Sequence, residues 1–88
     1  MKEVTLVVEN ETGLHARPAK VFVNIAKKYA SDIRVLHGEK RVNAKSLISM
    51  LTLGAERGAQ IQIVVDGEDE DEALLALQTA VEEGLGEE

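Results

Sequence analysis

Cysteine is absent from this chain of 88 residues, and aromatic side chains are almost absent. Without cysteine the protein cannot hold a disulfide framework or a cysteine-based metal or redox centre. The only aromatic residues are Phe22 and Tyr29, so the core must be built from aliphatic side chains. No apolar run approaches the roughly 20 residues that a membrane-spanning helix needs, and the first residues do not resemble a signal peptide. We therefore expect a cytoplasmic protein that is not inserted in a membrane.

Positive charge is scarce and unevenly placed. The chain has 10 lysine and arginine residues against 16 aspartate and glutamate residues, which gives a formal net charge of −6. A nucleic-acid partner is not expected, because binding to the phosphate backbone demands a basic face. The acids crowd the end of the chain, whereas Lys20, Lys27 and Lys28 lie in the first predicted helix. These lysines either steer an acidic protein toward that helix or simply keep its outer face in water.

Length and apolar patterning indicate one small α+β domain over residues 1–88. Alternating apolar residues predict strands over residues 3–9, 33–37, 41–43 and 60–66. Helical spacing predicts helices over residues 16–29, 47–53 and, from residue 69 or 70, to about residue 83. This βαββαβα order predicts an open-faced sandwich, in which three helices cover one face of a four-stranded antiparallel sheet. The pattern alone leaves a ferredoxin-like strand arrangement open.

Residues Thr12 to Pro18 carry the most specific chemical signal in the chain. The chain turns at Gly13, and Pro18 fits only in the first turn of a helix, where its missing N–H has no partner to lose. His15 is thereby placed at the helix start, beside unpaired N–H groups and the positive end of the helix dipole. This setting attracts anions and favours a neutral imidazole. With the guanidinium of Arg17 nearby, the segment can accept a phosphoryl group on a ring nitrogen.

Each of the two histidines also has a simpler, structural interpretation. A lone histidine at a helix start is most often a surface residue or a helix cap, and His15 by itself would be no exception. His37 ends a predicted strand with neither an arginine nor a helix start nearby in the sequence. We therefore expect no chemical role for His37.

The predicted helix over residues 47–53 is apolar on nearly every side, and so short a helix cannot bury every face. We assign Met50 and Leu53 to the core. The side chains expected to stay partly exposed, as a docking surface, are Leu47, Ile48 and Leu51. Ser46 is the predicted N-cap of this helix. Packing is expected to bring Ser46 close to the other helix start, which carries His15.

Two blocks of the chain resemble the HPr family, the histidine phosphocarriers of the phosphoenolpyruvate–sugar phosphotransferase system. The first runs from Gly13 to Ala19 and is similar to the family's active-centre signature. The second runs from Val42 to Gly54 and is similar to its regulatory-serine region. The spacing of the blocks is family-like, and the resemblance extends over the whole chain. It implies the open-faced sandwich of that family rather than the ferredoxin-like alternative.

The resemblance also implies a function. Phospho-enzyme I would phosphorylate His15 on Nδ1, and the group would pass to the IIA domains of sugar permeases. Arg17 and the backbone N–H of Ala16 would stabilise the phosphoryl charge, without a metal or a cofactor. The partners would dock on Lys20, Lys27, Lys28, Leu47, Ile48 and Leu51. Such a protein is a carrier and not an enzyme, because it is itself the covalent intermediate, and we expect it to act as a monomer.

Regulation is a further implication of the resemblance. A serine kinase, opposed by a phosphorylase, would modify Ser46 and add a charge of about −1.5 to −2 beside the docking helix. This charge would weaken docking of an acidic enzyme I and create a surface for a transcriptional regulator. Two alternatives remain open. The chain could be a paralogue in a nitrogen-related phosphotransfer chain, or a regulatory binding domain that is switched only at Ser46, although an intact His15 and Arg17 argue against the second.

Overall fold

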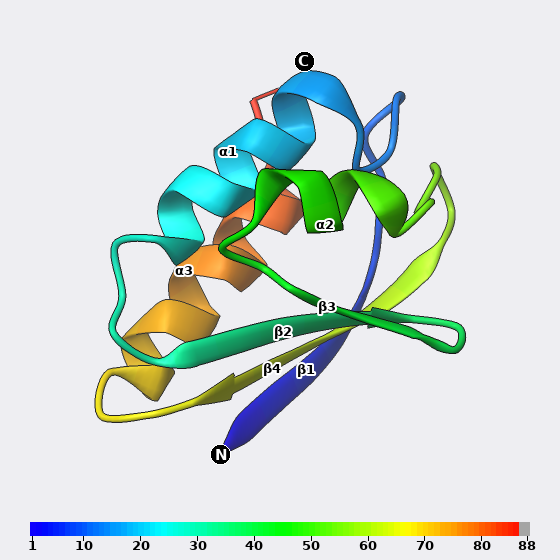
Figure 1. The fold of residues 1–88 in the computed structure, drawn as a ribbon. Coiled ribbons are helices and arrows are strands. Elements are labelled where there is room, and N and C mark those ends of the chain that lie inside the picture. Colours follow the sequence, from blue (N-terminus) through cyan, green and yellow to red (C-terminus); the bar gives the residue numbers. More distant parts are fainter. Residues whose placement is uncertain (87–88) are drawn as a thin grey trace.

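The computed structural model describes residues 1–86, in which a four-stranded antiparallel sheet is covered on one face by helices (Figure 1). The strands are β1 (Lys2–Val7), β2 (Asp32–His37), β3 (Lys40–Asn43) and β4 (Gln60–Asp66). The helices of this described part are α1 (Ala16–Ala26), α2 (Leu47–Thr52) and α3 (Glu70–Glu82). No helix covers the other face of the sheet between residues 1 and 86. The predicted open-faced sandwich is confirmed.

The strands lie in the order β1-β4-β2-β3, and every neighbouring pair is antiparallel. The last strand in the chain is therefore inserted between β1 and β2. Its Ile63 lies opposite Val4 of β1 on one side and Val35 of β2 on the other. In this order β1 is an edge strand, which sets the sheet apart from a ferredoxin-like one, where the first strand is internal.

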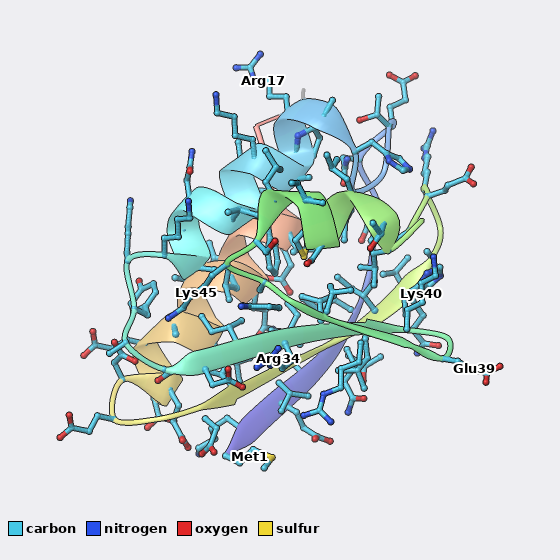
Figure 2. All side chains as sticks on the ribbon, in the orientation of Figure 1. Met1, Arg17, Arg34, Glu39, Lys40 and Lys45 are labelled. Carbon is cyan, nitrogen blue, oxygen red and sulfur yellow. The ribbon has the colours of Figure 1, made fainter. Side chains whose placement is uncertain are left out.

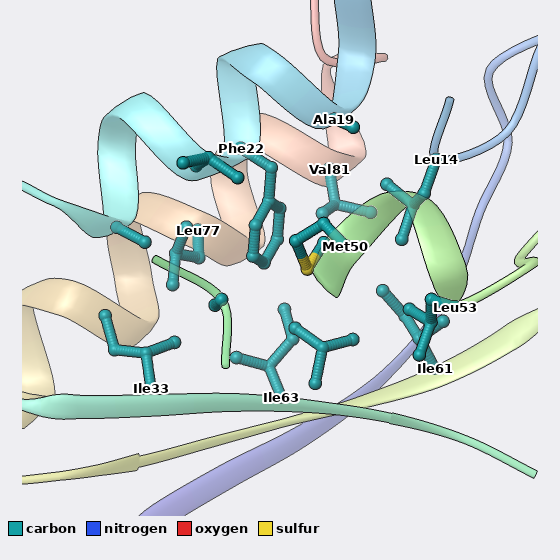
Figure 3. Close-up of a cluster of buried hydrophobic side chains, with 14 of the residues drawn as sticks. Leu14, Ala19, Phe22, Ile33, Met50, Leu53, Ile61, Ile63, Leu77 and Val81 are labelled. Carbon is teal, nitrogen blue, oxygen red and sulfur yellow. The ribbon is translucent and has the colours of Figure 1, made fainter. Parts of the chain in front are cut away.

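The aliphatic core lies between the sheet and the helices (Figure 3). The strand residues that face the helices and are fully buried are Ile33, Val35, Ile61, Ile63 and Val65. Phe22 of α1, Met50 of α2 and Leu77 of α3 pack against them, so each helix contributes to one common core. Phe22 is the largest side chain among the fully buried ones. This shared packing holds α1 and α2, which carry the candidate site, on the same sheet.

Most helices and strands begin and end near the predicted residues, but α1 ends at Ala26, three residues before its predicted end. Beyond Ala26 the N–H groups of Lys28 and Tyr29 bond to carbonyls three residues back, as in a tighter terminal turn. The carbonyl of Tyr29 then accepts a hydrogen bond from Nζ of Lys45 at 2.7 Å. The Tyr29 carbonyl, at the predicted end of the helix, therefore bonds to a side chain from a later part of the chain and not to a further helical N–H. None of the helices within residues 1–86 is long and apolar enough to cross a membrane.

Candidate functional site

The start of α1 carries His15 in the N-cap position. The backbone of His15 is extended, with φ −124° and ψ 159°, and Ala16 follows with a φ of +47° in the left-handed region. A residue with a Cβ in that region costs about 1–2 kcal/mol, and backbone strain of this kind clusters at functional sites. Pro18 lies buried in the first turn. The structure thus places His15 where the sequence predicted, at the first turn of the helix.

The loop before His15 is held in place by the segment that follows α2. The N–H of Leu14 donates to the carbonyl of Ala55 at 2.8 Å. Gly13, with a φ of +69°, approaches so closely that an added Cβ would lie 2.5 Å from the carbonyl oxygen of Ala55 and 2.6 Å from Cα of Glu56. Within the loop, Nδ2 of Asn10 donates to the carbonyl of Gly13 at 2.6 Å. Glycine is therefore required here by the backbone angle and by the space.

The imidazole of His15 is half-buried and makes no capping hydrogen bond to the helix. Helix geometry leaves the N–H groups of Ala16 and Arg17 without a partner inside the helix, at the positive end of its dipole. The side chain of Arg17 is exposed and points away from the helices into solvent (Figure 2). The ring nitrogen and the amide donors are thus open to an anion that arrives from solvent, whereas the guanidinium of Arg17 must turn back toward the helix start to reach it.

An open, mostly apolar groove of about 630 Å³ lies between α1 and α2. The residues that line it are Ala16, Arg17, Lys20, Val21, Asn24, Leu47 and Leu51. Met50 and Leu53 are buried as predicted, whereas Leu47 and Leu51 are 37% and 40% exposed and Ile48 is 77% exposed. Exposed apolar surface gathered on one short helix is typical of a protein docking site. The structure therefore brings Leu47 and Leu51 together with Arg17 and Lys20 in one groove, whereas Ile48 is exposed beside them on α2 and does not line the groove.

Two of the predicted docking lysines lie apart from this groove. Lys27 is the C-cap of α1 and Lys28 follows it, and both side chains are exposed. At a rise of 1.5 Å per residue, Lys27 lies about 16 Å along the helix axis from Ala16. Of the three lysines, only Lys20 lines the groove.

Ser46 occupies the N-cap of α2, as predicted. Its Oγ accepts a hydrogen bond from the N–H of Ser49 at 3.3 Å, and its own N–H donates to the carbonyl of Asn43 at 3.1 Å. The residue is half-buried. These contacts give Ser46 a structural role as the N-cap of α2, whether or not it is ever modified.

The expectation that the two helix starts lie close together is wrong, because α1 and α2 run in opposite directions (Figure 1). Lys45, just before α2, reaches Tyr29 beyond the end of α1. Leu14, just before α1, bonds to Ala55 beyond the end of α2. The end of α2 therefore lies beside His15, and its start lies beside the end of α1. The reason is topological, since β3 delivers the chain to the far end of α1.

Some residues around the site carry no signal in the sequence. Ala55 supplies the carbonyl that anchors Leu14, and His37 and Lys40 reach the carbonyls at the end of α2. Neither periodicity nor motif spacing predicts a contact between segments that are this far apart in the chain. The glycine at position 13 was the one available hint, because a left-handed glycine beside a motif often marks close backbone approach.

The chain is similar to one described protein family and to several solved structures. Residues 2–83 match the family described as "PTS HPr component phosphorylation site". HPr-C-His from Thermoanaerobacter tengcongensis is 46% identical, with 100% of this chain and 99% of that chain covered and a TM-score of 0.97. The phosphocarrier protein HPr from Bacillus anthracis is 37% identical, with 89% and 93% covered and a TM-score of 0.85. The Bacillus subtilis catabolite repression protein Crh, described as an intertwined, domain-swapped dimer, is 38% identical, with 96% and 97% covered and a TM-score of 0.76.

The family match spans both blocks that suggested the resemblance, the one from Gly13 to Ala19 and the one from Val42 to Gly54. The solved relatives align with this chain over most of their length and share its fold. Sequence and structure therefore agree on one assignment. The chain belongs to the HPr family of phosphocarrier proteins of the phosphotransferase system.

Proposed function

We propose that this protein carries a phosphoryl group on Nδ1 of His15, taken from phospho-enzyme I and passed to the IIA domains of sugar permeases. The observation that carries this proposal is the placement of a half-buried imidazole, without a capping hydrogen bond, at the start of α1. The family match supports it, because the matched description is that of a phosphorylation site. In this role the protein is a carrier and not an enzyme, and it needs no cofactor.

The chemistry follows from the groups at the helix start. The lone pair on Nδ1 of His15 attacks phosphorus, the P–N bond to the donor histidine breaks, and its electron pair returns to the donor ring. The amide N–H groups of Ala16 and Arg17 stabilise charge on the phosphoryl oxygens, and the exposed guanidinium of Arg17 can swing onto them. The positive end of the helix dipole lies at the point where charge on the phosphoryl oxygens is to be held. In the second transfer His15 is the donor: a nucleophile of the IIA domain attacks phosphorus, and the P–N bond to Nδ1 of His15 breaks.

Docking on the α1–α2 surface explains how two different partners reach one histidine. Leu47, Ile48 and Leu51 offer apolar contact, and Lys20 offers positive charge beside them. An acidic partner surface with an apolar centre complements this combination. Lys27 and Lys28 then act by steering the encounter, which needs no direct contact with the groove. Enzyme I and a IIA domain would use the surface in turn.

The test is labelling with ³²P-phosphoenolpyruvate and a catalytic amount of enzyme I. We expect acid-labile label that maps to the peptide containing His15, that is absent from His15→Ala, and that remains on Ser46→Ala. Labelled protein should then transfer its label to a IIA domain. Wild-type protein that takes no label, or label that survives in His15→Ala, would overturn the proposal.

A second candidate function is regulation through Ser46, and the likeness to Crh favours it. In this account a serine kinase phosphorylates Ser46, a phosphorylase removes the group, and a transcriptional regulator binds the modified form. The added charge would lie at the start of α2, next to the exposed apolar side chains of Leu47 and Ile48. Incubation with ATP and such a kinase should give acid-stable label that Ser46→Ala lacks. If only this label forms and His15 takes none, the regulatory function stands alone.

Sugar uptake separates the sugar pathway from a nitrogen-related one. A nitrogen-related paralogue would take label on His15 but would fail to restore sugar uptake in cells that lack their own carrier.

We place the protein in the cytoplasm, where enzyme I and the IIA domains would meet it, and we expect the monomer to be the active form. Sedimentation at micromolar concentration tests the monomer against a dimer such as the one described for Crh.

A further inference from the structure

The C-terminal end of α2 is held by two side chains of the β2–β3 hairpin. Nδ1 of His37 lies 3.1 Å from the carbonyl oxygen of Leu53, and Nζ of Lys40 donates to the carbonyl of Thr52 at 2.6 Å. Because a carbonyl can only accept, Nδ1 of His37 must carry the hydrogen. Figure 2 shows Lys40 at the hairpin, close to the end of α2. The hairpin thus supplies donors to the carbonyls that end the docking helix.

A helix as short as α2 depends on such partners. It spans 6 residues, and although the carbonyls of Ser49 and Met50 accept from Thr52 and Leu53, helix geometry leaves the carbonyl of Thr52 without a partner in the helix. His37 and Lys40 form the last pair of the β2–β3 ladder and share one face of it. His37 is half-buried, whereas Lys40 is exposed. The histidine is therefore the partner that is better shielded from competition by water.

The same end of α2 holds the loop that carries His15. Only Gly54 separates Leu53 from Ala55, and the carbonyl of Ala55 accepts the N–H of Leu14 at 2.8 Å. Leu14, Leu53 and Ala55 are at most 1% exposed. Figure 3 shows Leu14 and Leu53 at the same end of the core. A continuous set of buried contacts therefore links the hairpin, the end of α2 and the residue before His15.

We propose that His37 is a positioning residue for phosphoryl acceptance at His15. Its Nδ1–H holds the carbonyl of Leu53 in place. This contact orients the segment from Leu53 to Ala55, and the carbonyl of Ala55 in turn anchors the N–H of Leu14. His37 touches no reacting atom and acts only through these contacts. The proposal rests on the carrier function proposed above, whereas the coupling between His37 and Leu14 can be measured without it.

Two variants of His37 separate the donor from the space that the ring fills. His37→Leu fills similar space without a donor, and His37→Asn keeps an N–H donor at the same number of bonds from Cβ as Nδ1. Arg41→Met is the matched control, because Arg41 is exposed and belongs to the same hairpin but lies opposite Leu36, on the other face of the ladder.

The first measurement is hydrogen exchange at the amide of Leu14, taken as a ratio to the amide of Ile63 in the central strand β4. We expect His37→Leu to raise this ratio about threefold to tenfold, the range for loss of one hydrogen bond. His37→Asn should restore most of the protection, and Arg41→Met should match wild type. An unchanged ratio in His37→Leu would overturn the proposal, and so would equal loss in both His37 variants.

The second measurement is the single-turnover rate of phosphoryl transfer from phospho-enzyme I. At saturating donor we expect the rate of His37→Leu to fall about threefold to tenfold, with recovery in His37→Asn and an unchanged half-saturating donor concentration. A wild-type rate in His37→Leu, or an effect confined to the half-saturating concentration, would overturn the positioning role. If wild type takes no label on His15, the carrier function fails and the positioning role with it. If wild type is labelled but Leu14 exchange does not respond to His37, only the positioning role fails.

Discussion

The carboxylate of Asp69 accepts a hydrogen bond from the N–H of Ser31 at 3.0 Å, and this contact joins two loops that are far apart in the chain. The same carboxylate accepts the N–H of Ala30 at 2.8 Å and the hydroxyl of Ser31. Asp69 is the N-cap of α3, so these contacts tie the connection between α1 and β2 to the turn between β4 and α3. This clamp lies at the opposite end of α1 from His15 and bears on stability rather than on chemistry.

The Asp69 clamp makes stability depend on pH in a predictable direction. Hydrogen bonds from the Ser31 hydroxyl and the Ala30 N–H lower the pKa of Asp69 below its ordinary value of 3.8. The folded state therefore favours the carboxylate, and this contribution to stability is complete above the unfolded-state pKa and is lost as the pH falls through the lower folded-state pKa. We expect the thermal midpoint of wild type to fall more steeply below about pH 3.8 than that of Asp69→Asn, as measured by circular dichroism.

The control for this experiment is Glu72→Gln, which removes an exposed carboxylate from the first turn of the same helix. It should keep the pH dependence of wild type. Parallel curves for wild type and Asp69→Asn would show that the Asp69 carboxylate is not linked to folding.

Two glycines with nearly the same backbone angle should respond differently to alanine. Gly13 and Gly54 have φ values of +69° and +70°, but only at Gly13 would an added Cβ collide with backbone atoms, those of Ala55 and Glu56. Gly54→Ala should cost about 1–2 kcal/mol of unfolding free energy, the penalty of a left-handed alanine. Gly13→Ala should cost about 1–3 kcal/mol more, because the contact must open. Urea denaturation measures both, and equal losses would contradict a tight contact at Gly13.

Ala16 should be stabilised by a substitution that ordinarily weakens a helix. Its φ of +47° is strained for alanine and relaxed for glycine. Ala16→Gly should therefore raise the free energy of unfolding by about 1 kcal/mol. Ala80→Gly, inside α3, should lower it by about 0.5–1 kcal/mol. The opposite signs are the prediction, and a loss at both positions in thermal or urea denaturation would contradict strain at Ala16.

Ile48 and Leu75 offer a matched pair for the docking surface. They are 77% and 66% exposed, on α2 and α3 respectively. Because neither side chain is buried, a serine at either position should change stability by less than about 0.5 kcal/mol. Ile48→Ser should weaken binding to enzyme I by about 1–2 kcal/mol in calorimetry, because it removes an exposed apolar side chain from the proposed docking surface on α2. Leu75→Ser should bind like wild type, and equal weakening in both variants would place the interface elsewhere.

The sequence by itself determined which segments form strands and helices and which side of each is buried. The alternation from Ile61 to Val65 predicted β4, because the period of a strand reports which residues face the core. Pro18 located the start of α1 and hence His15, because a proline constrains its own backbone locally. The exposed and buried sides of α2 followed from its length and composition, since so short a helix cannot hide every apolar side chain.

Only the tertiary structure decided which segments are partners. The periodicity of β4 is the same whether or not it lies between β1 and β2, so the strand order could not be read from the pattern alone. The opposed directions of α1 and α2, which separate Ser46 from His15, follow from where β3 ends on the sheet. The anchoring of Leu14 by Ala55 and the contact of His37 with Leu53 join segments that are distant in the chain. A local pattern states that a group will be buried, but the identity of the group it meets is set by packing across the whole core.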